Sequence, residues 1–224
     1  MGFHVEIDSC HGGSFRGYAA PVVDGSRVGS VLIVHEWFGL NDSMRRQADR
    51  FAAVGFHALA VDLYGGKVAG DAESARQLAA EMRTQHAMQV IAAATEYVRG
   101  QPNTTGKVGL AGFCLGGAVA LAAAGNVEGL SATVTFCGLP PPRYTDVSRI
   151  TAPVMGHYGL RDPLLPISQP QALFSALAAA GKRALLHTYE AGHAFMRMSS
   201  QSYHAAVADL AWERTLGLFR EELM

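Results

Sequence analysis

The chain has 224 residues, of which 49% are hydrophobic and 17% are charged, and its formal net charge is −1. This composition excludes a disordered chain, and the balanced charge argues against a nucleic-acid-binding surface or a polybasic membrane-binding segment. At about 150 residues per domain, residues 1–224 are expected to form a single domain that acts on a small molecule.

Strand-like and helix-like segments alternate along the chain. Continuous apolar runs predict strands buried on both faces, and apolar residues spaced by three and four predict amphipathic helices. In chain order, the predicted elements are a strand at 30–35, a helix at 41–54, a strand at 56–61, two helices within 72–99, a strand at 107–113, a helix at 115–124, strands at 131–137 and 153–158, a helix at 168–180, a strand at 183–189 and a helix at 203–219.

Several boundaries within this series carry local signals. Asn41 or Asp42 can cap the first helix and Gly55 can end it. The helical region 72–99 is expected to break near Thr84, and the first 25 residues are expected to add a short antiparallel hairpin. The repeated order of strand and helix predicts an α/β fold with a mostly parallel sheet and helices on both faces.

The residues that directly follow each strand are the candidates for chemistry, because ligands of open parallel sheets bind beyond the carboxyl ends of the strands. Gly112-Phe-Cys114-Leu-Gly116 follows the strand at 107–113. This is a nucleophile-elbow pattern with a cysteine in place of the serine, and the start of the next helix favours a thiolate there. The alternative for Cys114 is a small buried core residue.

An acid and a histidine follow two later strands. Asp162 comes after the strand at 153–158, and His193 comes after the strand at 183–189. Considered singly, Asp162 is as readily a turn residue as a functional acid, and His193 is as readily a loop histidine as a functional base. The chain order of nucleophile, acid and histidine is that of the α/β-hydrolase triad, so we expect Cys114 to attack a carbonyl, His193 to transfer the proton and Asp162 to orient His193.

A fourth strand end carries His35-Glu-Trp-Phe-Gly-Leu-Asn41. In an α/β-hydrolase this loop supplies one oxyanion-hole amide and the residue after the nucleophile supplies the other, so we assign the N–H groups of Trp37 and Leu115 to the oxyanion hole. Glu36 lies beside them in sequence. We expect it to accept the thiol proton or to hold it until substrate arrives, with a surface carboxylate as the alternative.

Together these motifs resemble those of the dienelactone hydrolase (carboxymethylenebutenolidase) family. The resemblance rests on segments 35–41, 62–64, 106–117, 159–162 and 192–195, and extends over about residues 15–220. It implies an α/β-hydrolase fold with little or no cap, in which a Cys-His-Asp triad opens a small anionic lactone through a thioester. It also implies that Glu36 switches the thiol on when an anionic substrate displaces it.

The same resemblance implies that arginines bind the substrate carboxylate. One family arginine lies four residues after the triad histidine, which is Arg197 here. The other belongs to a helix after the Asp-Leu-Tyr strand, where Arg76 is the candidate and Arg83 the alternative. Phe38 is assigned to the substrate site as well. The aromatic pocket residues that the family has on that helix have no counterpart here.

Other signals argue against further chemistry. The His35-Glu36 pair lacks the second histidine of the H-E-x-x-H zinc motif, and no phosphate-binding or dinucleotide-binding motif occurs, so we expect no metal and no cofactor. Cys10 and Cys137 lack an elbow and are expected to be inert. Three scattered cysteines without a C-x-x-C pair, together with a first segment that lacks the apolar core of a signal peptide, predict a cytoplasmic protein.

Three functional hypotheses follow from these residues. The first is a dienelactone hydrolase, which we expect to act as a monomer on a small anionic lactone or ester, with no nucleic-acid or membrane partner. The second is a carboxylesterase of broader specificity on the same triad. The third is a non-catalytic thiol sensor, which an intact triad and the absence of a resolving cysteine nearby in sequence disfavour.

Overall fold

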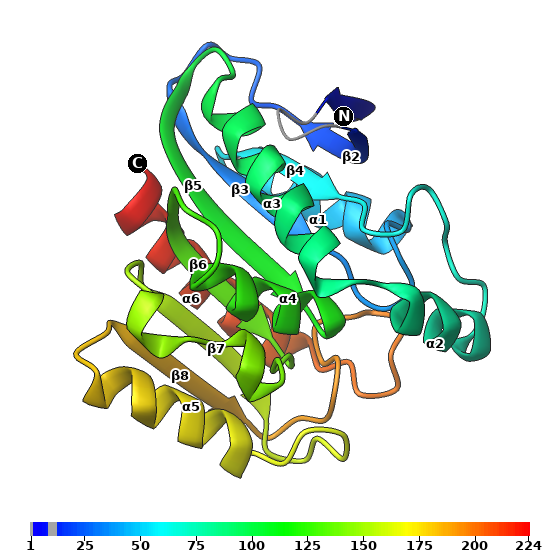
Figure 1. Ribbon diagram of the computed structural model, residues 1–224, viewed down its shortest axis with the longest axis vertical. Coiled ribbons are helices and arrows are strands. Elements are labelled where there is room, and N and C mark those ends of the chain that lie inside the picture. Colours follow the sequence, from blue (N-terminus) through cyan, green and yellow to red (C-terminus); the bar gives the residue numbers. More distant parts are fainter. Residues whose placement is uncertain (1, 9–12) are drawn as a thin grey trace.

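A twisted sheet forms the centre of the molecule in the computed structural model, which describes residues 2–8 and 13–224 (Figure 1). Cys10 lies outside the described residues. Within them, the sheet has eight strands in the order β1-β2-β4-β3-β5-β6-β7-β8. The strands are β1 (Phe3–Asp8), β2 (Ser14–Ala20), β3 (Val28–Val34), β4 (His57–Val61), β5 (Thr104–Phe113), β6 (Leu130–Phe136), β7 (Val154–Gly159) and β8 (Ala184–Tyr189).

The strand directions confirm the predicted parallel sheet and the predicted hairpin. β1 and β2 pair antiparallel with each other, and β2 pairs antiparallel with β4. All pairings from β4 through β8 are parallel. β3 is buried along its whole length, as expected for a continuous apolar strand covered on both faces.

Helices cover both faces of the sheet. They are α1 (Asp42–Ala53), α2 (Ala72–Glu81), α3 (Thr84–Arg99), α4 (Leu115–Ala124), α5 (Ser168–Ala179) and α6 (Ala205–Leu223). Side chains of α1 and α6 share one hydrophobic cluster with the sheet, and side chains of α3, α4 and α5 form the clusters on the other face. Two 3-10 turns, at Pro142–Tyr144 and Val147–Arg149, lie between β6 and β7.

Helix starts follow capping chemistry, which explains small differences from the predicted bounds. The side chain of Asn41, not that of Asp42, accepts hydrogen bonds from the N–H groups of Ser43 (3.0 Å) and Met44 (3.2 Å), so α1 starts one residue later than predicted. His204 caps α6 by accepting from Val207, which places that helix start at Ala205 instead of Tyr203.

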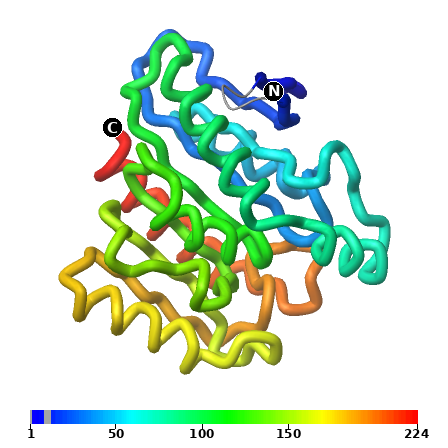
Figure 2. Tube along the Cα trace, viewed as in Figure 1, coloured from blue at the N-terminus to red at the C-terminus, as the bar shows by residue number. Residues whose placement is uncertain are grey.

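The carboxyl ends of β3, β5, β6, β7 and β8 meet along one edge of the sheet. Figure 2 shows that α2 and the segment between β8 and α6 lie beyond this edge, and residues of both border one pocket there. No helix among the described residues has the length and apolar character needed to cross a bilayer.

Candidate active site

The turn between β5 and α4 is as sharp as a nucleophile elbow requires. Cys114 has φ 52° and ψ −112°, which lies in the left-handed half of conformational space that few non-glycine residues occupy. A Cβ on Gly112 would lie 2.0 Å from the carbonyl oxygen of Gly116, and a Cβ on Gly116 would lie 2.3 Å from that of Val34. Only glycine fits at these two positions, so the elbow depends on both.

The structure brings Cys114, Asp162 and His193 together in one chain of hydrogen bonds. His193 Nδ1 lies 2.7 Å from Asp162 Oδ2, and His193 Nε2 lies 3.1 Å from Cys114 Sγ. Each residue follows a different strand, β5, β7 or β8, so the parallel sheet itself places the three side chains at one edge.

The loop after β7 holds Asp162 in a fixed orientation. Its Oδ1 accepts hydrogen bonds from the backbone N–H groups of Leu164 (2.8 Å) and Leu165 (3.2 Å), which leaves Oδ2 for His193. The carboxylate is buried. A buried acceptor satisfied on both oxygens suits the role of orienting a histidine tautomer.

The electrostatics of the pair favour a charged imidazole. Burial alone lowers the pKa of His193, but the hydrogen bonds to Asp162 and Cys114 and the negative charges of both raise it to about 10. With Nδ1–H donated to Asp162, the ring can hold a proton at Nε2 and exchange it with the sulfur of Cys114. This arrangement can carry out nucleophilic attack and proton transfer to a leaving group.

A second charged pair lies on the β3 side of the cysteine. Arg197 Nη1 donates to Glu36 Oε2 across 3.2 Å, and the Glu36 side chain is only 5% exposed. Burial raises the pKa of Glu36, and the charge of Arg197 opposes that rise. In this conformation Glu36 is paired with Arg197, and the sulfur of Cys114 is paired with His193.

The two predicted oxyanion-hole residues, Trp37 and Leu115, and the predicted substrate residue Phe38 lie at the same edge of the sheet. Trp37 and Leu115 border the same pocket as Cys114. Leu115 is the first residue of α4, where backbone N–H groups have no partner within the helix. Phe38 does not border this pocket; its ring lies 5.2 Å beneath the guanidinium of Arg197.

The two arginines proposed from the helical region do not reach this pocket. Arg76 is 66% exposed and pairs with Glu73 on the same helix at 2.6 Å. The helix α2 turns Ala75 inward and Ala79 toward the pocket, so Arg76, one residue after Ala75, is rotated by about 100° and points to solvent. Contact between Arg76 and a substrate at Cys114 would require α2 to move.

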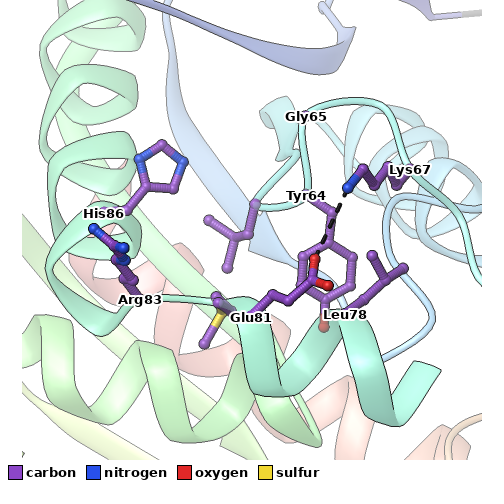
Figure 3. Close-up of a pocket in the computed structure, with 9 residues that line it drawn as sticks. Tyr64, Gly65, Lys67, Leu78, Glu81, Arg83 and His86 are labelled. Carbon is purple, nitrogen blue, oxygen red and sulfur yellow. Dashed lines mark ion pairs between the residues drawn. The ribbon is translucent and has the colours of Figure 1, made fainter. Parts of the chain in front are cut away.

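Arg83 borders a different cavity, of about 230 Å³, beside the start of α3. Figure 3 shows Arg83 and His86 on one side of this cavity, with the ion pair between Lys67 and Glu81 on the other. Neither Cys114 nor Arg197 lines it. In this conformation the active-site pocket therefore receives its positive charge from Arg197 and the imidazolium of His193.

Cys137, which was expected to be inert, borders the pocket, a position that the sequence interpretation did not predict. It directly follows β6 and is 4% exposed. Its sulfur, a carboxylate oxygen of Asp162 and a nitrogen of His193 all lie within 4.8 Å of one another, which makes these three the candidate metal ligands among the described residues. The strand-end rule that identified Asp162 and His193 would have found Cys137 too.

The environment of Cys137 differs from that of Cys114. Burial raises the pKa of the Cys137 thiol to about 12, and the charges of Asp162 and Cys114 act in the same direction. A neutral thiol packed against the histidine–aspartate pair is a poor nucleophile. The chemistry of the pocket therefore centres on Cys114.

Comparisons with known proteins agree with this geometry. Carboxymethylenebutenolidase 1 of Cupriavidus pinatubonensis is 30% identical over 225 residues, which is 96% of this chain and 94% of that protein. The carboxymethylenebutenolidase of Pseudomonas putida is 34% identical over 199 residues, 83% of each chain. The crystal structure of a dienelactone hydrolase-like promiscuous phosphotriesterase from metagenomic libraries superimposes with a TM-score of 0.84 at 26% identity, over all of this chain and 99% of that one.

The resemblance seen in the motifs is thus confirmed at the level of the whole chain. The eight-stranded sheet of the described residues and its structural neighbours show the α/β-hydrolase fold. The relatives identify a hydrolase that acts on small esters or lactones. Residues 15–223 match the dienelactone hydrolase family, and the chain belongs to that family.

Proposed function

We propose that the chain hydrolyses a small lactone of the dienelactone type through a thioester on Cys114. The thiolate attacks the lactone carbonyl, and the N–H groups of Trp37 and Leu115 stabilise the oxyanion. His193 protonates the ring oxygen as the C–O bond breaks, which leaves an open-chain acyl thioester. Water then attacks the thioester while His193 takes its proton, and Cys114 leaves as the thiolate.

The observation that carries this proposal is the unbroken path from Asp162 through His193 to Cys114, with separations of 2.7 Å and 3.1 Å. Both distances lie within hydrogen-bond reach, as a nucleophile and its base require. The sulfur stands at a strand-to-helix turn and borders a pocket of about 730 Å³. A thiol sensor has no need of this oriented acid–base pair.

Arg197 is the residue that we propose binds an anionic end of the substrate. Its guanidinium borders the pocket, and its Nε is buried without a hydrogen-bond partner. A substrate carboxylate would compete with Glu36 for the guanidinium. In this mechanism His193, and not Glu36, accepts the thiol proton. The names of the curated relatives, carboxymethylenebutenolidases at about 30% identity, support a carboxylated lactone.

A carboxylesterase of broader specificity is the second candidate. It is favoured by the position of Arg76, which faces solvent, and by Ala79, a small residue where α2 borders the pocket. Both features weaken selection for a small dianionic or strongly anionic ligand. In either case we expect a cytoplasmic enzyme that works as a monomer without a cofactor or a metal.

Steady-state rates on a dienelactone and on a neutral ester, measured with the wild type and Cys114→Ala, test the proposal. We expect wild type to turn over the dienelactone with the higher kcat/KM and the variant to lose both activities. Cys10→Ala is the control for loss of a thiol as such. Retained hydrolysis by Cys114→Ala would contradict the nucleophile, and a preference for the neutral ester would favour the broader esterase.

A further inference from the structure

The pocket around Cys114 is lined by both charged and apolar side chains. Glu36 lies after β3 with the indole of Trp37 beside it, and Arg197 and the serine-rich loop at 199–202 also line the pocket. On the β6 and β7 side the wall is made by Leu139, Leu164 and Leu165. We propose that these three leucines form an apolar subsite for a hydrocarbon substituent of the substrate, and this inference rests on the proposed ester or lactone hydrolysis at Cys114.

Position and rigidity support a binding role for these leucines. Leu164 and Leu165 are two and three residues after Asp162, and their backbone N–H groups are the donors that hold its Oδ1. The backbone of Leu164 and Leu165 is therefore fixed to the same carboxylate that orients His193. Leu139 and Leu165 are partly buried against the cluster that contains Phe174 on α5.

Exposure supports the same role for Leu164, whose side chain is 72% exposed at the rim of the pocket. A single exposed leucine needs no explanation on its own. Here Leu164 lines the same pocket as two other leucines and Cys114. A substrate chain laid over this wall would remove the apolar surface of all three residues from water.

The size of the pocket also fits a substrate with such a substituent. Its volume of about 730 Å³ lies within the range of pockets that enclose drug-sized ligands, roughly 300–1,000 Å³. On α2, the pocket is bordered by Ala79, whose side chain is a single methyl group. The subsite thus suits an ester or lactone with an aliphatic chain of several carbons, while its polar end lies toward Arg197.

Two series of aliphatic esters, followed by pH-stat, test the subsite. In one the acid is lengthened, from methyl acetate through methyl butanoate to methyl hexanoate; in the other the alcohol is lengthened, from methyl through butyl to hexyl acetate. We expect kcat/KM to rise in one series by up to about fourfold per methylene, the transfer value of a buried methylene group. The series that rises identifies the arm of the substrate that lies on the leucines.

Variants of the wall separate the subsite from general damage. In the responsive series, we compare kcat/KM for the longest ester with kcat/KM for the shortest. We expect Leu164→Ala and Leu139→Ala to lower this ratio about tenfold. Leu160→Ala is the matched control, because Leu160 is also an exposed leucine after β7 (43%) but does not border the pocket; its ratio should match wild type.

The outcomes keep this inference distinct from the proposed function. If wild type hydrolyses methyl acetate in a Cys114-dependent manner but shows no chain-length effect in either series, the subsite is wrong and the mechanism stands. An equal loss for short and long esters in Leu164→Ala would also overturn the subsite. If Cys114→Ala retains wild-type rates, the proposed mechanism itself fails.

Discussion

Arg197 donates a hydrogen bond of 3.2 Å to the buried carboxylate of Glu36, which is 161 residues away in sequence, and both residues line the same pocket as Cys114. The pair has two consequences. The negative charge of Glu36 weakens the attraction of the Arg197 guanidinium for an incoming anion. The hydrogen bond to Arg197 also holds the Glu36 carboxylate away from the sulfur of Cys114. An anionic ligand must therefore offer Arg197 a better partner than Glu36 does.

Glu36→Gln tests this competition. Glutamine keeps the shape and can still accept a hydrogen bond from Arg197, but it removes the competing negative charge. We expect KM for a carboxylated lactone to fall several-fold while KM for a neutral ester stays unchanged. Glu73→Gln, which alters the exposed pair with Arg76, is the control and should change neither value. An equal loss of kcat on both substrates would instead indicate that Glu36 acts directly on the thiol.

Arg197→Ala tests the carboxylate site from the other side. Hydrogen bonds to charged groups contribute about 1.5–3 kcal/mol, so KM for a carboxylated substrate should rise by roughly 10- to 100-fold. The neutral ester should be affected much less. Arg76→Ala should behave like wild type on both, since its side chain faces solvent. Thermal unfolding must accompany the kinetics, because the variant leaves Glu36 buried without its cation.

The sheet and the hydrogen-bonded residues at its edge could be predicted because both depend on local patterns. Buried parallel strands appear in the sequence as apolar runs, and their carboxyl ends meet at one edge of the sheet. Cys114, Asp162 and His193 each follow such a strand, so the sheet brings them to the same edge. The chain order of the three residues, which is nucleophile, acid and histidine, then indicated the role of each.

The orientation of Arg76 and the close contacts of Cys137 could not be predicted in the same way. Whether Arg76 reaches the pocket depends on the rotation of α2 about its axis, and Ala75 and Ala79 occupy the inward positions. The strand-end rule places Cys137 at this edge, since it directly follows β6, but its distance from His193 is set by the tertiary structure. Orientation of a short helix and contacts between separate loops are tertiary properties.

Asp162→Asn should lower kcat by about four orders of magnitude, as in serine triads. The asparagine carbonyl can still accept the N–H groups of Leu164 and Leu165, so the loop should survive, but its amide would face His193 Nδ1 and select the wrong tautomer. Circular dichroism checks that the fold is intact. Near-normal turnover would remove Asp162 from the mechanism.

The pH dependence follows from the raised pKa of His193, about 10. Below that pH the imidazolium is present and can protonate a leaving alkoxide, so kcat/KM for an alkyl ester should fall as pH rises through about 10. NMR titration offers an independent check. In Cys114→Ala the ring loses the hydrogen bond and the charge of the thiolate, so its pKa should drop. A wild-type His193 that titrates near its usual value of about 6.5 would contradict the ion pair.

Gly112→Ala tests how strongly the elbow depends on the close approach of α4. The added methyl group would lie 2.0 Å from the carbonyl oxygen and 2.5 Å from the carbonyl carbon of Gly116, and neither backbone atom can rotate away. We expect a loss of about 3 kcal/mol in the free energy of unfolding, at the upper end for overpacking, together with loss of activity as the turn shifts.

Gly217→Ala is the matched control. Gly217 lies on the exposed face of α6, away from the helix ends, and its Cβ would meet nothing within 4 Å, so this change should stabilise the protein by about 0.5–1 kcal/mol. Urea denaturation of both variants measures the difference, and equal stability of the two would mean that the backbone at Gly112 relaxes without cost.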